Sequence, residues 1–223
     1  MSDGDERNAI HHFKRHQHLA REGEEQQAVF LLEDGWAARY RVLSDGRRQI
    51  NALFLPGEYC EPQWILGQCA TYPVIALTTI RARAVPIADI DDRLAGPARM
   101  PGILKAILLM INRQADWTVS LARKTAYERI CGLFCDLFDR LRASNRVVNN
   151  RCPMPLTQYD IADIAGLTPV HVNRVLQVLR SQGLIELDSK WLRLPDPEAV
   201  RQHSAEPPNR AAALDVRLRQ NAA

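Results

Sequence analysis

The residues from Leu156 to Leu194 place the strictest limit on what this chain can fold into. Thr157, with an acidic residue three positions later, has the pattern that caps a helix, and Gly166 provides the turn that ends it. Thr168 caps a second helix, which begins with Pro169 at a position where the missing N–H does no harm. Two short amphipathic helices around a glycine turn predict a helix-turn-helix, the second helix of which enters a DNA major groove.

The second predicted helix has an apolar face and a polar face. Gly183 ends the helix, and the residues from Leu184 to Leu194 follow as a β-wing. The side chains expected to face the core are Val172, Val175, Leu176 and Leu179. The opposite face therefore carries the contacts to a partner.

The polar face has the residue types that recognise duplex DNA. Arginine can donate two hydrogen bonds to guanine, and asparagine can pair in two places with adenine. The residues predicted to read bases are Arg174, Asn173, Val170 and His171. Contacts to phosphates position a protein without reading sequence, and the residues predicted for them are Thr157, Thr168, Gln177 and Arg180.

The overall charge neither requires nor excludes a nucleic-acid partner. The 223 residues contain 29 Lys and Arg against 26 Asp and Glu, a formal net charge of +3. So small an excess does not by itself identify a protein that binds polyanions. The prediction of double-stranded DNA as partner therefore rests on where the side chains lie. A winged helix that binds another protein is the alternative.

The first half of the chain reads as antiparallel strands. From Val29 to about Ile87, β-prone runs alternate with turn signals roughly every ten residues. Asp34-Gly35 and Asp45-Gly46 are dipeptides typical of hairpins, and Pro56-Gly57 is a further turn. This pattern predicts a small β-roll or barrel.

A long helix with two apolar stripes follows the strands. One stripe repeats at alternating spacings of four and three and consists of Ile103, Ile107, Met110, Gln114, Trp117 and Leu121. The second stripe repeats in the same way and consists of Leu104, Leu108, Ile111, Ala115, Thr118 and Ala122. Because both flanks are apolar, the helix is expected to face a partner chain with one stripe and its own β-domain with the other. The first stripe is assigned to the interface with the partner chain. A helix buried within a monomer is the alternative.

These segments divide the chain into four predicted parts of an α+β protein. They are a sensor-like β-roll at 1–96, a dimerisation helix with an interdomain helix at 97–143, a winged helix-turn-helix at 144–206 and a tail at 207–223. The interdomain helix is Ala126 to Ala143. The Asn- and Pro-rich segment from Ser144 to Pro155 reads as a linker.

The chain resembles bacterial regulators of the Crp/Fnr family over roughly Phe13 to Leu194. The stretches that carry the resemblance are Leu156-Thr157, Asp160-Ile161-Ala162, Gly166-Leu167-Thr168, Val172-Asn173-Arg174-Val175-Leu176, Gly183-Leu184-Ile185, Phe54-Leu55-Pro56-Gly57-Glu58 and Tyr127-Glu128-Arg129-Ile130. The resemblance implies a homodimer that binds a twofold-symmetric DNA site and contacts RNA polymerase. Arg174 falls on the guanine-reading arginine of the family. Pro169-Val170 stands where many members have a glutamate that reads cytosine, so a different operator is expected.

The family's cyclic-nucleotide signature is degenerate here. No arginine occurs between Arg48 and Arg81, where the family places the one that holds the cyclic phosphate. A buried phosphate without a guanidinium partner would lose its strongest hydrogen bonds, so cyclic AMP is not expected to bind. The candidate residues for a different effector are Glu58, Glu61 and Thr71.

Metal and redox sensing are secondary hypotheses. An iron–sulfur cluster needs four thiolates, which the family places mainly near the amino terminus, and the first cysteine here is Cys60. Cys131 and Cys135 share a helical face and read as small core residues, with a redox switch as the alternative. His12 and His16, within a cluster of four early histidines, would share a helical face and could answer to pH or a metal. No cofactor and no resident metal are therefore expected.

The remaining classes of protein fit less well. The segment from His18 to His171 contains no histidine between its ends, so a metalloenzyme of the cupin type would lack its ligands, and an enzyme is not expected. The most apolar run, from Ile103 to Ile111, is far shorter than the roughly 20 residues that cross a bilayer. The amino terminus lacks a secretory signal. A cytoplasmic protein without a membrane partner is the expectation.

Overall fold

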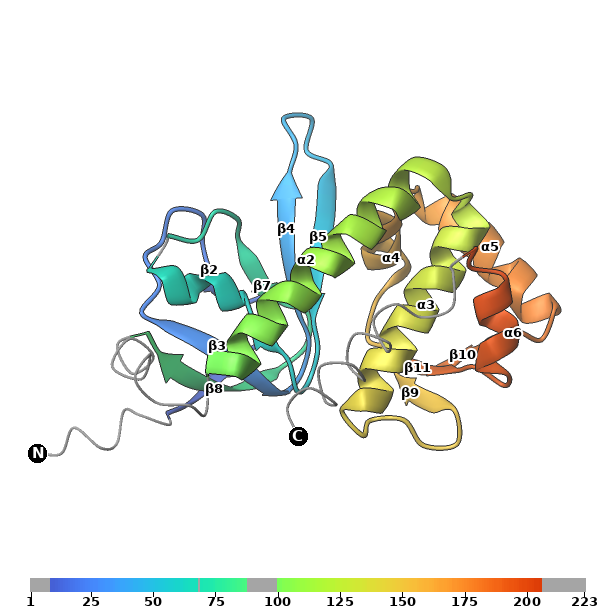
Figure 1. The fold of residues 1–223 in the computed structure, drawn as a ribbon. Helices are drawn as coiled ribbons and strands as arrows, with labels where there is room; N and C mark the ends of the chain where they lie inside the picture. The colour runs from blue at the N-terminus through green and yellow to red at the C-terminus, as the bar shows by residue number, and fades with distance from the viewer. Residues whose placement is uncertain (1–8, 68, 88–99, 206–223) are drawn as a thin grey trace, which may run out of the picture.

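The structure, a computed structural model, describes residues 9–67, 69–87 and 100–205. A β-roll is followed by two helices and a small domain of helices and short strands (Figure 1). The α+β architecture predicted from the sequence is confirmed. The predicted boundary at 96/97 and the tail at 207–223 lie outside the described residues.

The roll consists of two four-stranded sheets in which neighbouring strands are antiparallel. The first has the order β1 (Ile10–Phe13), β8 (Ile80–Pro86), β3 (Ala28–Asp34) and β6 (Tyr59–Cys60). The second has the order β2 (His18–Ala20), β7 (Val74–Ala76), β4 (Ala37–Val42) and β5 (Arg48–Phe54). A short 3-10 helix, η2 (Pro62–Leu66), follows β6.

The two predicted hairpin dipeptides have different roles. Asp45-Gly46 connects β4 and β5, which pair directly, so a hairpin forms there. Asp34-Gly35 instead connects β3 to β4, which belong to different sheets, so the hairpin expected there was wrong. A side chain at position 35 would lie 2.3 Å from the carbonyl oxygen of Thr79, and φ is +87°. Glycine is therefore required by the close approach of two strands rather than by a hairpin turn.

The strands β1 and β2 precede the region that was predicted to be β-structure. His11 and His12 lie in β1, so the helical face expected for His12 and His16 does not form. The ring of His11 contacts the rings of Phe13 and Phe30.

Two helices connect the roll to the carboxy-terminal domain. α2 (Met100–Arg123) runs across the roll, and α3 (Ala126–Ala143) runs back beside the carboxy-terminal domain (Figure 1). Thr125 ends the turn between them and caps α3. Its hydroxyl oxygen accepts a hydrogen bond from the Glu128 amide, and the Glu128 carboxylate accepts one from the Thr125 amide.

The carboxy-terminal domain is a winged helix-turn-helix. Its elements are β9 (Arg151–Pro153), α4 (Gln158–Ala165), α5 (Pro169–Ser181), β10 (Glu186–Asp188), β11 (Trp191–Arg193) and α6 (Pro197–Gln202). The wing is three-stranded because β9 pairs with β11. The segment interpreted as a linker therefore contains a strand, and that interpretation was incomplete.

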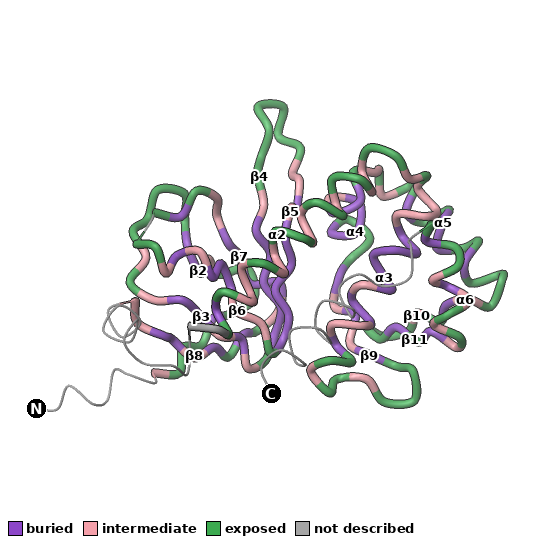
Figure 2. Tube along the Cα trace, in the orientation of Figure 1, coloured by how far each residue is buried: buried purple, intermediate pink, exposed green. Residues whose placement is uncertain are grey.

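The hydrophobic core runs across the domain boundary. One buried cluster, which includes Phe30 and Trp64, lies within the roll. Another begins in the roll with Trp36, continues through Phe134 of α3 and reaches Leu179 of α5. The buried segments of the tube accordingly extend from the roll through α3 (Figure 2). The roll and the winged domain are thus packed together as well as joined by the chain.

Candidate nucleic-acid interface

The helix α5 forms where the capping signals predict it. The side chain of Thr168 accepts from the amide of His171, and Pro169 occupies the first helical position. Val172, Val175, Leu176 and Leu179 are all buried, as predicted. These contacts fix α5 against α3 and α4 and leave its opposite face outward.

The outward face carries the predicted base-reading residues. Arg174, Asn173 and His171 are exposed, and 64% of the surface of Val170 is accessible. Gln177 and Arg180, predicted to contact phosphates, are exposed further along the same helix. All six side chains are therefore accessible to a ligand that approaches α5.

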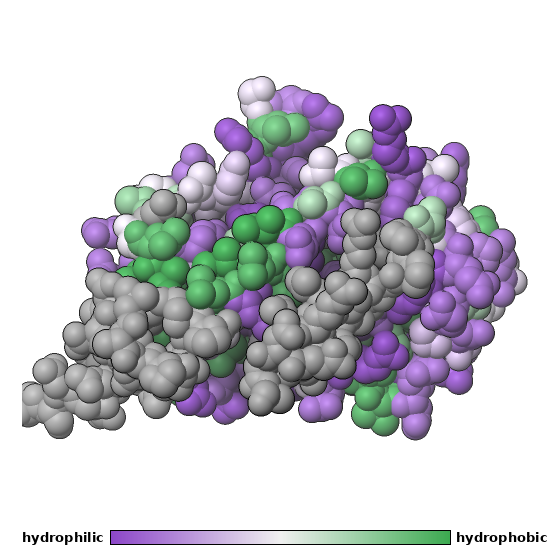
Figure 3. All heavy atoms as spheres, in the orientation of Figure 1, coloured by the Kyte–Doolittle hydropathy of each residue, from purple (hydrophilic) through white to green (hydrophobic). Residues whose placement is uncertain are grey.

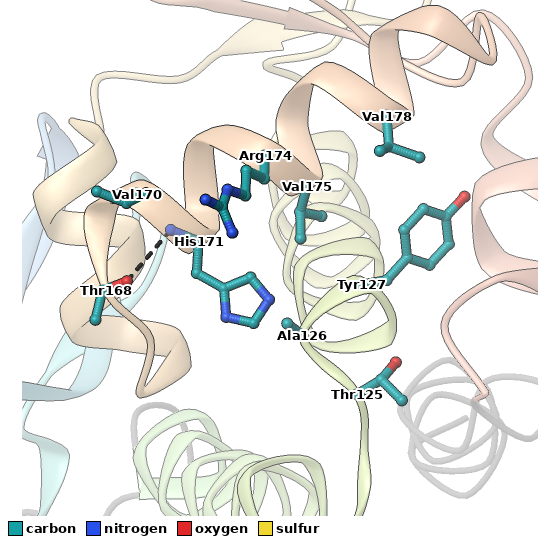
Figure 4. A pocket seen from close by; sticks show the side chains of 9 residues that line it. All are labelled: Thr125, Ala126, Tyr127, Thr168, Val170, His171, Arg174, Val175 and Val178. Carbon is teal, nitrogen blue, oxygen red and sulfur yellow. Dashed lines mark hydrogen bonds between the residues drawn. The ribbon is translucent and has the colours of Figure 1, made fainter.

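A groove runs between α5 and the start of α3. Its lining consists of Thr125, Ala126, Tyr127, Thr168, Val170, His171, Arg174, Val175 and Val178. Figure 4 shows the side chains of Arg174 and His171 directed into the space between the two helices. The sequence had not singled out Thr125, Ala126 and Tyr127 as site residues. The Tyr127-Glu128-Arg129-Ile130 motif was the signal that could have drawn attention to them.

The two threonines predicted to contact phosphates have structural partners. Thr157 takes part in a complete capping box. Its hydroxyl oxygen accepts a hydrogen bond from the Asp160 amide, and the Asp160 carboxylate accepts one from the Thr157 amide. Thr168 caps α5 as described above. Both residues are exposed at helix starts, so their caps leave them on the surface of the domain.

The two stripes of α2 differ in burial, and the first is the more buried. Ile103 is buried, and Ile107, Met110, Gln114, Trp117 and Leu121 are partly buried. Contacts to their own chain include Gln114 to the backbone of β5 and Trp117 to the core beside α3. This stripe, which was assigned to the interface between chains, therefore faces its own chain.

The second stripe is the one that faces outward. Leu104, Leu108, Ile111, Ala115, Thr118 and Ala122 are all exposed, and the exposed fractions of Leu104, Leu108 and Ile111 are 51%, 50% and 55%. Hydrophobic atoms gather across the middle of this side of the molecule, where α2 crosses it (Figure 3). Three large apolar side chains thus lie half exposed in one row on the surface of the single chain.

Glu58 connects the roll to both long helices. Its carboxylate accepts from Arg140 of α3 at 2.6 Å and 2.9 Å and pairs with Arg113 of α2 at 3.0 Å. Burial would raise the pKa of Glu58, but the positive charges of Arg140 and Arg113 outweigh burial and lower it. Arg140 also donates to the carbonyl of Leu53 at 2.6 Å. Both oxygens of this predicted effector residue therefore hold α2 and α3 against the roll.

Glu61, another predicted effector residue, lies inside the roll. It pairs with Arg39 of β4 at 3.1 Å, and Arg39 also donates to Asn51 at 2.8 Å and lies over the ring of Tyr72. Gln63 donates to the same carboxylate, while Oε1 of Glu61 is buried without a hydrogen-bond partner. Thr71 lies on the surface before β7.

The Glu61 environment does not fit a cyclic nucleotide. The guanidinium of Arg39 is already used by Glu61 and Asn51, and no arginine lies between positions 49 and 80. A cyclic phosphate placed here would meet a buried carboxylate oxygen, and like charges repel strongly in a buried site.

Burial favours the neutral forms of the thiols of Cys131 and Cys152 and of the imidazole of His18. Cys131 and Cys135 lie in the core on α3, and burial raises the pKa of Cys131 to about 12. Burial likewise raises the pKa of Cys152 to about 12 and lowers the pKa of His18, which bonds the Tyr40 hydroxyl. In the part of the chain that the structure describes, no three His, Cys, Asp or Glu side chains are grouped so as to hold a metal ion.

Both halves of the chain match known protein families. Residues 10–95 match the cyclic nucleotide-binding domain, and residues 128–203 match the Crp-like helix-turn-helix domain. The chain belongs to the Crp/Fnr family. Like other Crp/Fnr-type regulators, the protein is a DNA-binding regulator of transcription.

Curated relatives agree with this assignment, and a solved structure has the same fold. The nitrogen fixation regulation protein FixK of Azorhizobium caulinodans is 28% identical over 192 residues, or 85% of this chain and 77% of that protein. The transcriptional activator protein FnrL of Cereibacter sphaeroides is 29% identical over 175 residues, or 75% of this chain and 68% of that protein. The structure of FixK2 from Bradyrhizobium japonicum covers 90% of this chain and 98% of that chain, with a TM-score of 0.78 and 23% identity.

A helix that crosses a bilayer must be long and apolar. Over the described ranges, no helix of this Crp/Fnr regulator combines the length and the apolar character needed to cross a membrane.

Proposed function

We propose that this Crp/Fnr regulator works as a homodimer that reads a twofold-symmetric operator, with α2 as the dimer helix. The observation that carries the proposal is the outward stripe of α2, on which Leu104, Leu108 and Ile111 are half exposed in a row. Such a row repeats at the spacing with which two helices pack as a coiled coil. A second copy of the same helix is a self-complementary partner for it.

In the proposed complex each α5 enters a major groove. Arg174 then reads a guanine, Asn173 an adenine, and His171 and Val170 contact neighbouring bases. The phosphate backbone passes the edge of this face at the start of α5, beside Thr168. The two α5 helices are separated by about 34 Å, one turn of DNA, and the twofold symmetry of the dimer makes the operator palindromic.

The regulator is proposed to act without cyclic AMP and without a resident iron–sulfur cluster or metal. The ion pair between Arg39 and Glu61 inside the roll supports this, because it occupies polar groups that a nucleotide would require. The buried thiols of Cys131 and Cys152 support it as well, because a thiol with a pKa of about 12 remains protonated and is a poor metal ligand near neutral pH. Control would then come from the amount of protein or from a different ligand.

The site of action follows from the operator. A regulator of bacterial transcription meets its DNA in the cytoplasm and contacts RNA polymerase there. The proposal assigns the chain no enzymatic role, which agrees with the regulators among its relatives.

Selection of binding sites from random duplex DNA, with the purified protein and no added ligand, tests the proposal. The expected result is a palindromic site bound by two chains, with the mass of the free protein equal to a dimer in solution. A folded dimer that enriches no sequence would contradict action without an effector, and a monomer would contradict the role of α2.

A further inference from the structure

The hairpin of β4 and β5 projects from the roll (Figure 1), and side chains at the start of β5 contact α4, the first helix of the helix-turn-helix. Arg48, near the end of this hairpin, donates from Nε to Asp163 at 2.6 Å and from Nη2 to Asp160 at 2.8 Å. Both carboxylates lie on α4, more than 100 positions further along the chain. One arginine of the roll thus forms two ion pairs with the DNA-binding domain.

These ion pairs are partly shielded from water, so they contribute more to the free energy of domain packing than exposed pairs do. The exposed fractions of the side chains are 30% for Arg48, 12% for Asp160 and 25% for Asp163. A fully exposed pair contributes little, because water and salt screen it. Arg47, the neighbour of Arg48, shows the contrast: 76% of its side chain is exposed, and it pairs with Asp45 of the same hairpin.

The other end of α4 is also held from outside the helix. Gln49, next to Arg48, donates to the carbonyl of Ile164 at 3.1 Å, and Arg129 of α3 donates to the carbonyl of Ala165 at 3.0 Å. The last carbonyls of a helix have no partner within the helix, so these side chains satisfy them. The roll therefore contacts α4 through Arg48, at Asp160 in the first turn and Asp163 in the last, and through Gln49 at the carbonyl of Ile164.

We propose that Arg48 is a positioning residue for DNA recognition, which holds α4, and through it α5, at a fixed orientation to the roll and to α2. The orientation matters because the two α5 helices of a dimer must match successive major grooves. This inference rests on the proposed dimeric operator complex. It adds that a residue of the sensor-like roll, remote from the bases, contributes to the choice of DNA.

The orientation that Arg48 holds leaves the predicted DNA-binding face of α5 accessible. Arg174, Asn173 and His171 are exposed in it, and the groove beside α5 is open. The outward stripe of α2 is uncovered in the same state. Loss of the ion pairs is therefore expected to weaken operator binding. Without them the orientation of the DNA-binding domain is not fixed in the free protein, and fixing it on the operator costs binding free energy.

The test compares full-length variants on the selected operator and on random duplex DNA. Arg48→Met removes both ion pairs and keeps a side chain of similar length. Asp163→Ala removes one pair and leaves the Asp160 capping box intact, and alanine does not weaken a helix. Arg47→Met is the matched control, because it removes the same charge from the same hairpin without a contact to α4.

Arg48→Met is expected to lower operator affinity about tenfold and affinity for random DNA less than threefold. Asp163→Ala is expected to cost about threefold on the operator, and the double variant should match Arg48→Met, since the two residues act through one contact. Arg48→Lys should restore part of the loss, and Arg47→Met should resemble the wild type. Circular dichroism and thermal unfolding verify that each variant is folded.

Several results would overturn the proposal. They are operator affinity unchanged within twofold for Arg48→Met, an equal loss for Arg47→Met, an equal loss on random DNA, additive losses in the double variant, or tighter operator binding. If Arg48→Met does not fold, Arg48→Lys and Asp163→Ala carry the same comparison. A wild-type protein that selects no site refutes the operator complex itself, whereas a wild-type protein that selects one while the variants do not differ refutes only the role of Arg48.

Discussion

Gln114 of α2 donates a hydrogen bond from Nε2 to the backbone carbonyl of Asn51 in β5, at 2.6 Å. This contact fixes the rotation of α2 about its axis, because a polar side chain in an apolar stripe is directed onto the roll. The stripe that contains Gln114 is consequently internal, and the stripe that contains Leu108 faces outward.

Leu108→Glu is expected to convert a dimer into a monomer. Leu108 is half exposed in the single chain, so the change should leave the fold of one chain intact while it places a charge in the interface between two. Sedimentation or light scattering measures the mass. Val148→Glu is the control, since Val148 is 69% exposed and lies away from α2. A dimer that survives Leu108→Glu would remove α2 from the interface.

Arg174→Ala is expected to weaken operator binding by roughly 1–3 kcal/mol and to relax the preference at one base position. The side chain is exposed on α5 and points into the groove, so its removal takes away hydrogen bonds to bases without disturbing the core. Binding-site selection with the variant measures the preference. Equal losses on operator and random DNA would contradict a base-reading role.

Arg180→Ala, by contrast, should lower the affinity for all DNA sequences to a similar degree. Arg180 is exposed near the end of α5 and is assigned to a phosphate, which carries no sequence information. Affinity measured over a series of salt concentrations should show a slope reduced by about one. A change in the selected sequence would instead make Arg180 a reader.

Glu58→Gln is expected to destabilise the protein by roughly 3 kcal/mol at neutral pH, because Arg140 and Arg113 then lose a shared, largely buried counter-charge. The folded-state pKa of Glu58 is lowered, so its stabilisation is present above the unfolded-state pKa, about 4.3, and is lost as pH falls through the folded value. Urea unfolding should therefore show the difference between variant and wild type shrinking in acid. A difference that does not vary with pH would contradict this account.

Gly35→Ala and Gly46→Ala should differ strongly in stability. Both glycines have a φ near +86°, so alanine is strained at either position. At position 46 an added Cβ meets nothing within 4 Å, and a loss of about 1 kcal/mol is expected from the backbone alone. At position 35 the Cβ would overlap the Thr79 carbonyl, so a loss several times larger is expected in thermal unfolding. Equal losses would show that the β3–β4 turn adapts.

The local signals of the helix-turn-helix were sufficient to predict it. Thr157 and Thr168 cap helices, Gly166 ends one, and the buried face of α5 is the predicted one, because capping and helical periodicity depend on neighbours within a few residues. Short strands such as β1 and β9 were missed. These segments are strands because of the strands they pair with, and short local patterns do not reveal such pairing. Ile10–Phe13 pairs with β8, and Arg151–Pro153 pairs with β11.

The sequence by itself thus determined the winged helix-turn-helix, the β-roll and the presence of two apolar stripes on α2. Tertiary structure alone decided which stripe is internal, since both have the same spacing and only the contacts of Gln114 and Trp117 distinguish them. It also decided that Glu58 anchors helices and that Arg48 contacts α4. The reason is physical, because periodicity records local geometry. The ion pairs Glu58–Arg140 and Arg48–Asp163 join residues that are separated by 82 and 115 positions in the sequence, so they exist only once the roll and the helices have packed.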